Sequence, residues 1–153
     1  MHSHLFFQYC QKLVIVSADK KSVLLAKRTG EADYDGTFSF VGGKVETSDE
    51  TLIDGMRREK NEEIGEEAKL KVLAQESYNV LFRKKDGSSM IIPHIAAVFE
   101  SGKIRLSDEY SSNKWVALDE LEGFEPKIES IPEIVKWAAD KLATIQSEQL
   151  VEI

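Results

Sequence analysis

The chain has 153 residues, a formal net charge of −7 and 42% hydrophobic residues. This composition is typical of one globular domain with its own core, and it excludes a disordered chain. The negative charge argues against binding along a nucleic-acid backbone. No apolar run reaches the roughly 20 residues that a membrane-spanning helix needs. We therefore expect a single domain over residues 1–153 that binds neither a nucleic acid polymer nor a membrane.

Cysteine usage and the start of the chain indicate the compartment. Cys10 is the only cysteine, so no internal disulfide forms, which is typical of a reducing cytoplasm. Residues 1–11 lack the basic region and long apolar stretch of a signal peptide. We expect a cytoplasmic protein.

The first part of the chain predicts strands. Residues 12–19 and 22–28 are rich in Val, Ile and Leu on either side of a polar turn, so they predict an opening hairpin. Residues 29–36 hold two glycines and three acids and predict a loop. Residues 37–43 predict a short strand that ends on a glycine pair.

A helix is predicted over residues 50–64. Thr47 or Ser48 is the expected N-terminal cap, and Gly65 is the expected C-terminal glycine. The buried stripe of this helix is predicted to consist of Leu52, Ile53, Met56 and Ile64.

The second part of the chain returns to strands and closes on a helix. Strands are predicted at residues 69–74, 76–83 and 90–100, a short strand around Trp115, and an amphipathic helix at residues 131–149. Pro93 predicts an edge position or a bulge in its strand. His94 is the one histidine of that strand, and we interpret it as structural.

The helix over residues 50–64 carries the chemistry. Glu59, Glu62 and Glu63 are three and four residues apart, so their carboxylates project from one face. Three carboxylates on one stripe repel each other, and a hard divalent cation removes that repulsion. Arg58, four residues before Glu62, is placed to hold a neighbouring carboxylate by a charge-assisted hydrogen bond.

These residues resemble the signature box of Nudix hydrolases, G-x5-E-x7-R-E-U-x-E-E-x-G-U, where U is a bulky aliphatic residue. We align Gly43 and Glu50 with its first two fixed positions, although six residues separate them instead of five. Lys60 takes the first aliphatic position, and we expect its methylene stem to lie along the core while its charge stays in water. The positions aligned with the rest of the box are Arg58-Glu59, Glu62-Glu63 and Gly65.

The resemblance implies an α/β fold, a Nudix-type α/β/α sandwich with a mixed β-sheet. It also implies hydrolysis of a phosphoanhydride bond in a nucleoside diphosphate linked to another group X. Mg²⁺ or Mn²⁺ would be held by the carbonyl of Gly43 and by three box carboxylates, namely Glu59, Glu62 and Glu63. Arg58 would orient the carboxylates. Glu62 or Glu63 is the first choice of general base, with Glu109 as the candidate from a later loop.

The expected substrate is a nucleoside triphosphate that is split into a nucleoside monophosphate and pyrophosphate. Phe38, Phe40 or Tyr78 could stack on its base. Phosphate contacts are expected from basic residues, of which the candidates are Arg28, Lys44, Arg83, Lys84 and Lys85. The principal candidates in this set of substrate contacts are Arg28, Phe40 and Lys44.

Three alternatives stay open at this point. The domain could bind a nucleotide without hydrolysing it, or it could hydrolyse ADP-ribose or a nucleotide sugar. A diphosphate isomerase on a related fold is disfavoured because the lone Cys10 lies at the N-terminal end. The sequence leaves the oligomeric state open, with a homodimer as the assembly considered.

Overall fold

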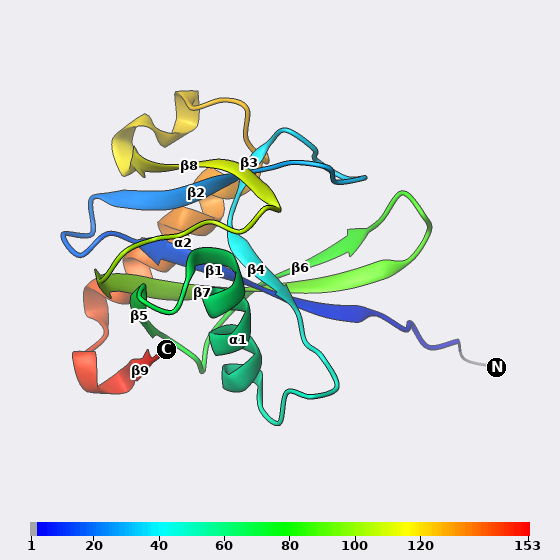
Figure 1. Ribbon diagram of the computed structural model, residues 1–153, viewed down its shortest axis with the longest axis horizontal. Helices are drawn as coiled ribbons and strands as arrows, with labels where there is room; N and C mark the ends of the chain where they lie inside the picture. The colour runs from blue at the N-terminus through cyan, green and yellow to red at the C-terminus, as the bar shows by residue number, and fades with distance from the viewer. Residues whose placement is uncertain (1–2) are drawn as a thin grey trace.

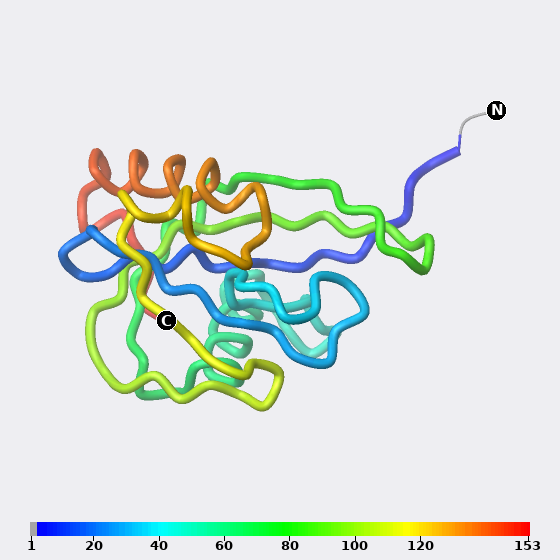
Figure 2. Tube along the Cα trace, turned by 90° about the horizontal axis from the view of Figure 1, so that it is seen from above, coloured from blue at the N-terminus to red at the C-terminus, as the bar shows by residue number. Residues whose placement is uncertain are grey.

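The computed structural model describes residues 3–153 (Figures 1 and 2). Strands predominate, and two α-helices separate them into groups. The elements in chain order are β1 Gln8–Val16, β2 Ser22–Arg28, β3 Phe38–Ser39, β4 Val41–Lys44, α1 Leu52–Ile64, β5 Lys69–Val72, β6 Tyr78–Arg83, β7 Ser89–Ser101, β8 Tyr110–Ala117, the 3-10 helix η1 Leu118–Gly123, α2 Ile131–Thr144, the 3-10 helix η2 Ser147–Gln149 and β9 Val151–Glu152.

The described strands join in one mixed sheet. Its main path runs β3-β2-β1-β7-β5-β9, while β4, β6 and β8 pair with β1, β7 and β2. The β1–β7 pair is parallel, from Gln8 opposite Met90 to Val16 opposite Val98. The other strand pairs of the described sheet are antiparallel. The sheet therefore brings β1, β4 and β7, which lie far apart in sequence, side by side at its centre.

Two apolar cores lie on opposite faces of this sheet because side chains alternate along a strand. In β1, Leu13 and Ile15 join the core under α1, whereas Val14 and Val16 join the core under α2. Figure 2 shows the two helices on opposite sides of the strands. The predicted α/β/α sandwich with a mixed sheet is confirmed.

Helix α1, which carries the acids of the signature box and is called the box helix below, begins at a different cap from the one predicted. Thr51, not Thr47 or Ser48, is the N-cap: its hydroxyl accepts from the backbone N–H of Asp54, and Asp54 accepts from the N–H of Thr51 in return. This reciprocal pair satisfies two backbone donors at the helix start. Asp49 and Glu50 lie between the nearer predicted cap, Ser48, and Thr51, and they belong to the loop after β4.

Lys60 also differs from the prediction. The side chain is only 1% exposed, and its Nζ donates to the carbonyl of Ala68 at 2.9 Å. The ammonium group is thus inside the fold and does not extend into water. A buried donor needs an acceptor, and the chain that leaves α1 supplies one. Burial lowers the pKa of Lys60.

Two further predictions change in the second half of the chain. The last helix ends at Thr144 instead of residue 149, because the chain becomes extended at Ile145 and then turns back. The returning chain forms β9, which pairs with β5, and Ile153 is buried in the core under α1. Pro93, expected at an edge or bulge, lies within β7, which has β1 on one side and β6 and β5 on the other.

No helix within residues 3–153 is both long enough and apolar enough to cross a membrane.

Candidate active site

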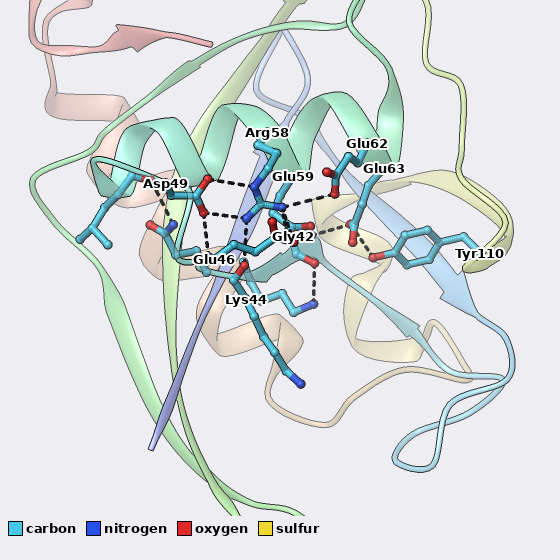
Figure 3. Close-up of polar contacts among 12 residues, drawn as sticks. Gly42, Lys44, Glu46, Asp49, Arg58, Glu59, Glu62, Glu63 and Tyr110 are labelled. Carbon is cyan, nitrogen blue, oxygen red and sulfur yellow. Dashed lines mark hydrogen bonds and ion pairs between the residues drawn. The ribbon is translucent and has the colours of Figure 1, made fainter. Parts of the chain in front are cut away.

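Arg58 connects the box helix to the loop that follows β4 (Figure 3). Its Nε and Nη2 donate to the two carboxylate oxygens of Asp49 at 2.9 and 2.8 Å. Its Nη1 lies 2.9 Å from Glu59 and 3.3 Å from Glu62. The two-pronged contact with Asp49 uses the fork geometry of the guanidinium and fixes its orientation. Arg58 is therefore held by the loop and in turn holds two carboxylates of the helix.

The acid that faces Arg58 is Asp49, although the sequence alignment put Glu50 in that position. Glu50 is exposed, whereas the Asp49 side chain is 4% exposed and also accepts from the backbone N–H of Glu46. The hydrogen bond from Arg58 lowers the pKa of Asp49 to about 2. Five residues separate Gly43 from Asp49, so the box spacing is kept up to this acid. The extra residue lies after it, where the loop enters the helix.

Exchange of Asp49 for asparagine tests this assignment. An amide presents its own N–H groups to the guanidinium, so Arg58 loses one of its two oxygen acceptors. We expect Asp49→Asn to lower the melting temperature by about 5 °C and kcat/KM by about tenfold. Glu50→Gln is the matched control and should change neither by more than experimental error. Differential scanning calorimetry and steady-state kinetics on the two variants make the comparison. Equal effects at the two positions would contradict the assignment.

The glycine pair lets the helix and β1 approach β4 closely. A Cβ on Gly43 would overlap the carboxylate of Glu59. Gly42 has a φ of +141°, and a Cβ there would overlap the carbonyl of Gln11 in β1. A side chain at either position would therefore displace a neighbour, and Gly43 is needed for Glu59 to reach the backbone of β4.

Glu63 is the most deeply buried acid of the box. Glu63 is 3% exposed. Its Oε2 accepts hydrogen bonds from the Gly42 N–H and from the Tyr110 hydroxyl, both at 2.7 Å (Figure 3). Burial raises the pKa of Glu63 to about 7, although the charge of Lys12 and these two hydrogen bonds act in the opposite direction. Without a bound cation, burial therefore favours the protonated form of this carboxyl more than water does.

The box acids offer the donors that a divalent cation needs. Glu59, Glu62 and Glu46 all approach one nitrogen, Arg58 Nη1, at 2.9, 3.3 and 3.4 Å. Oxygen donors of this kind suit Mg²⁺ and Mn²⁺. The guanidinium of Arg58 lies between the three carboxylates. Within residues 3–153, no three metal-ligating side chains are therefore close enough together to form a coordination site in this arrangement. The donor set fits a divalent cation because the acids already gather around a positive charge.

A cavity of about 780 Å³ opens beside these acids. Glu59, Glu62 and Glu63 form part of its wall, and so does the exposed Glu109 from the loop before β8. Apolar side chains form another part of the wall, and they include Phe40, Val80, Phe82, Met90 and Ile92. One space is therefore lined by both carboxylates and apolar side chains.

Three predicted substrate residues, Arg28, Phe40 and Lys44, line this cavity. Most of the other sequence candidates do not. Phe38 packs edge-on against Phe124 and Tyr78 against Trp137, on the side of the sheet that α2 covers. Among the basic residues of the β6–β7 hairpin, Lys84 is part of the wall. Arg83 instead donates to Ser89 Oγ at 2.8 Å, and Lys85 donates to the carbonyl of Ala32 at 3.2 Å.

Sequence reasoning missed two residues of the site. Tyr110 holds Glu63, and Lys12 reaches the carbonyl of Gly42 through its Nζ at 3.2 Å. Tyr110 follows Glu109 directly, so it lies in the segment from which the sequence analysis took a candidate base. Lys12 is a charged residue next to the apolar run Leu13–Val16, which is the one available signal for it. Their contacts span 47 and 30 residues, and no local pattern predicts such distances.

The chain was compared with known families and solved structures. The model of the NUDIX domain matches residues 12–138. The MutT protein from Methanosarcina mazei Go1 is 21% identical, with a TM-score of 0.68 over 94% of this chain and 100% of that one. A NUDIX family hydrolase from Clostridium perfringens is 20% identical, with a TM-score of 0.72 over 90% and 99%.

A C. elegans Ap4A hydrolase is 18% identical, with a TM-score of 0.71 over 90% of this chain and 99% of that one. Identities this low show a shared fold. Among curated proteins, no relative matches the chain significantly.

The family model covers most of the chain, including every acid of the box and the Trp115 strand. The chain therefore belongs to the NUDIX family. It is a hydrolase that acts on nucleoside diphosphate-linked substrates.

Proposed function

We propose that the protein is a divalent-metal-dependent pyrophosphohydrolase that converts a nucleoside triphosphate into a nucleoside monophosphate and pyrophosphate. The observation that carries this proposal is the cavity itself. Its wall includes Glu59, Glu62 and Glu63 together with apolar side chains such as Phe40 and Phe82. Acids that bind cations suit the polyphosphate, and the apolar side chains suit a flat nucleobase.

Each box residue receives a role from its position. Nudix hydrolases generally use divalent metals. We assign Glu59, Glu62, Glu63 and the Gly43 carbonyl to hold Mg²⁺ or Mn²⁺, which would supply charge stabilisation at the phosphoryl oxygens. Arg58 keeps two of these carboxylates in place.

Glu62 is the carboxylate that we assign as general base. Its side chain is 57% exposed and contacts Arg58 alone among residues 3–153, whereas Oε2 of Glu63 already accepts two hydrogen bonds. A carboxylate that faces the cavity and keeps free acceptor sites is better placed to take a proton from water. Glu109 faces the same cavity from a loop and is the alternative base.

The cavity wall also holds polar atoms that lack a protein partner. The buried hydroxyls of Ser39 and Ser107 have no hydrogen-bond partner within residues 3–153, and both residues line the cavity. Buried polar atoms are ordinarily satisfied. A polar ligand such as a nucleotide would give these hydroxyls acceptors or donors. Arg28, Lys44 and Lys84 add positive charge to the wall of a chain whose net charge is −7.

A second candidate substrate class is ADP-ribose or a nucleotide sugar. The NUDIX domain of a Shewanella oneidensis protein, NrtR, was solved in complex with ADP-ribose and has a TM-score of 0.68 with this chain. A domain of this fold thus holds a larger nucleotide. The cavity of about 780 Å³ has room for one as well.

Phosphate release across a nucleotide panel tests the proposal. The panel contains NTPs, dNTPs, oxidised dNTPs, ADP-ribose, nucleotide sugars and dinucleoside polyphosphates. Each is assayed with Mg²⁺ and with EDTA, and either pyrophosphatase or phosphatase is added as the coupling enzyme. We expect metal-dependent release of pyrophosphate from nucleoside triphosphates. Turnover of sugar-linked nucleotides alone would favour the second class, and tight binding without any turnover would favour a nucleotide sensor.

A further inference from the structure

Several apolar residues of the cavity wall lie on the β6–β7 hairpin, and the loop between β2 and β3 lies beside them. Phe82 of the hairpin packs on Tyr34 of that loop, with ring centroids 5.8 Å apart. Lys85 Nζ also joins the two segments, since it donates to the carbonyl of Ala32 at 3.2 Å. Val80 and Ile92 are cross-strand neighbours on the cavity wall. The hairpin and the loop therefore line one compartment of the cavity, which stays open to solvent.

His94 is a polar residue in the wall of this compartment. It is 7% exposed, and its ring meets Phe40 edge to face at a centroid distance of 5.6 Å. Its Nδ1 lies 3.0 Å from the backbone carbonyl of Tyr78. A carbonyl oxygen only accepts hydrogen bonds, so Nδ1 carries the proton of the ring.

The second ring nitrogen of His94 is therefore a hydrogen-bond acceptor. Burial lowers the pKa of His94 to about 4, so the ring is neutral at physiological pH. A neutral imidazole with its proton on Nδ1 has a lone pair on Nε2. The hydrogen bond to Tyr78 uses Nδ1, and no donor within residues 3–153 hydrogen-bonds to Nε2. A structural role for His94, as interpreted from the sequence, explains the hydrogen bond of Nδ1 but gives no role to Nε2.

We propose that His94 is a specificity-determining residue that accepts, at Nε2, a hydrogen bond from an exocyclic amino group of the substrate's nucleobase. This inference rests on the proposed nucleotide substrate and names its class: an amino-bearing base. A lone-pair acceptor matches an amino group, which donates hydrogens. Uracil, thymine and hypoxanthine carry a carbonyl oxygen where cytosine or adenine carries the amino group, and that oxygen would meet the lone pair of Nε2 with its own.

Two variants separate this role from a structural one. His94→Asn places an amide N–H where Nδ1–H donates to Tyr78, but it has no group at the position of Nε2. His94→Gln is longer, so its amide oxygen reaches the position of Nε2 while the contact with Tyr78 is lost. A base-recognition role predicts a defect in the asparagine variant. A purely structural role predicts the defect in the glutamine variant.

The measurement is nucleoside monophosphate binding by isothermal titration calorimetry in EDTA, which makes it independent of turnover. Three pairs differ by one amino group: AMP and purine riboside monophosphate, CMP and its 4-deamino analogue, and GMP and IMP. For the pair that binds best, we expect the native protein to favour the amino form by about tenfold, the size of one good hydrogen bond. His94→Asn should reduce this preference to about twofold or less, and His94→Gln should retain most of it. The same preferences are expected in kcat/KM for the triphosphates.

The outcomes separate the two proposals. Hydrolysis of nucleoside triphosphates without any preference for the amino form, or with a preference that survives in His94→Asn, overturns the role of His94 and leaves the proposed function intact. A His94-dependent preference in binding without hydrolysis supports the role of His94 and overturns the hydrolytic function. Failure to bind or hydrolyse any of these nucleotides overturns both.

Discussion

Glu62→Gln is expected to lower kcat by about 10²- to 10⁴-fold, the usual contribution of a general base. The side chain is 57% exposed and contacts Arg58 at 3.3 Å, so its loss should leave the fold and the melting temperature unchanged. A glutamine keeps the size of the side chain but cannot take a proton from water. Steady-state kinetics at saturating nucleoside triphosphate and Mg²⁺ measure the effect, and circular dichroism checks the fold.

Two controls distinguish a base from a metal ligand. Glu62 is assigned both roles. If the loss in Glu62→Gln came only from weaker cation binding, raising the Mg²⁺ concentration should restore most of kcat, and we expect no such rescue. Glu109→Gln removes the other exposed acid of the cavity, and we expect less than about a threefold loss, in line with an ordinary surface substitution. The assignment would fail if Glu109→Gln lost more activity than Glu62→Gln.

Much of the site was predictable because it lies on one helix. The spacing of Glu59, Glu62 and Glu63 follows the helical period, so the sequence predicts that they share a face. The sheet covered on both sides was instead implied by the resemblance to the family. Local periodicity is a property of the chain itself, and it holds wherever the element is placed in the fold.

The residues that the sequence analysis placed wrongly or missed owe their roles to contacts between elements. Asp49 and Glu50 are adjacent acids in a loop, and only the position of Arg58 in space selects Asp49. Lys60 stays inside because the chain after α1 offers the carbonyl of Ala68. The partner of His94, Tyr78, is 16 residues away on β6. Periodicity carries no information about such acceptors.

Glu63→Gln should make the metal-free protein more stable at pH 8 by up to about 3 kcal/mol, although it removes an acid of the active site. Burial raises the pKa of Glu63 from 4.5 to about 7, so the folded state binds this proton more tightly than the unfolded state. The stabilisation is complete below pH 4.5 and is lost as the pH rises through 7. A glutamine keeps one oxygen for the Gly42 N–H and the Tyr110 hydroxyl, and it never ionises.

Urea unfolding in EDTA, at intervals from pH 4.5 to pH 8.5, measures this difference. The stability of Glu63→Gln relative to the native protein should rise across the interval and level off above pH 7. The relative measurement removes other titrating groups, such as His94, because both proteins share them. Glu62→Gln is the matched control on the same helix, since that carboxylate is exposed. Saturating Mg²⁺ should reverse the order, because a ligand that binds the folded state stabilises it, and the native protein keeps the charge that binds the cation. A flat Glu63→Gln difference in EDTA would mean that Glu63 is ionised in the metal-free fold, in which case Lys12, Gly42 and Tyr110 compensate its burial in full.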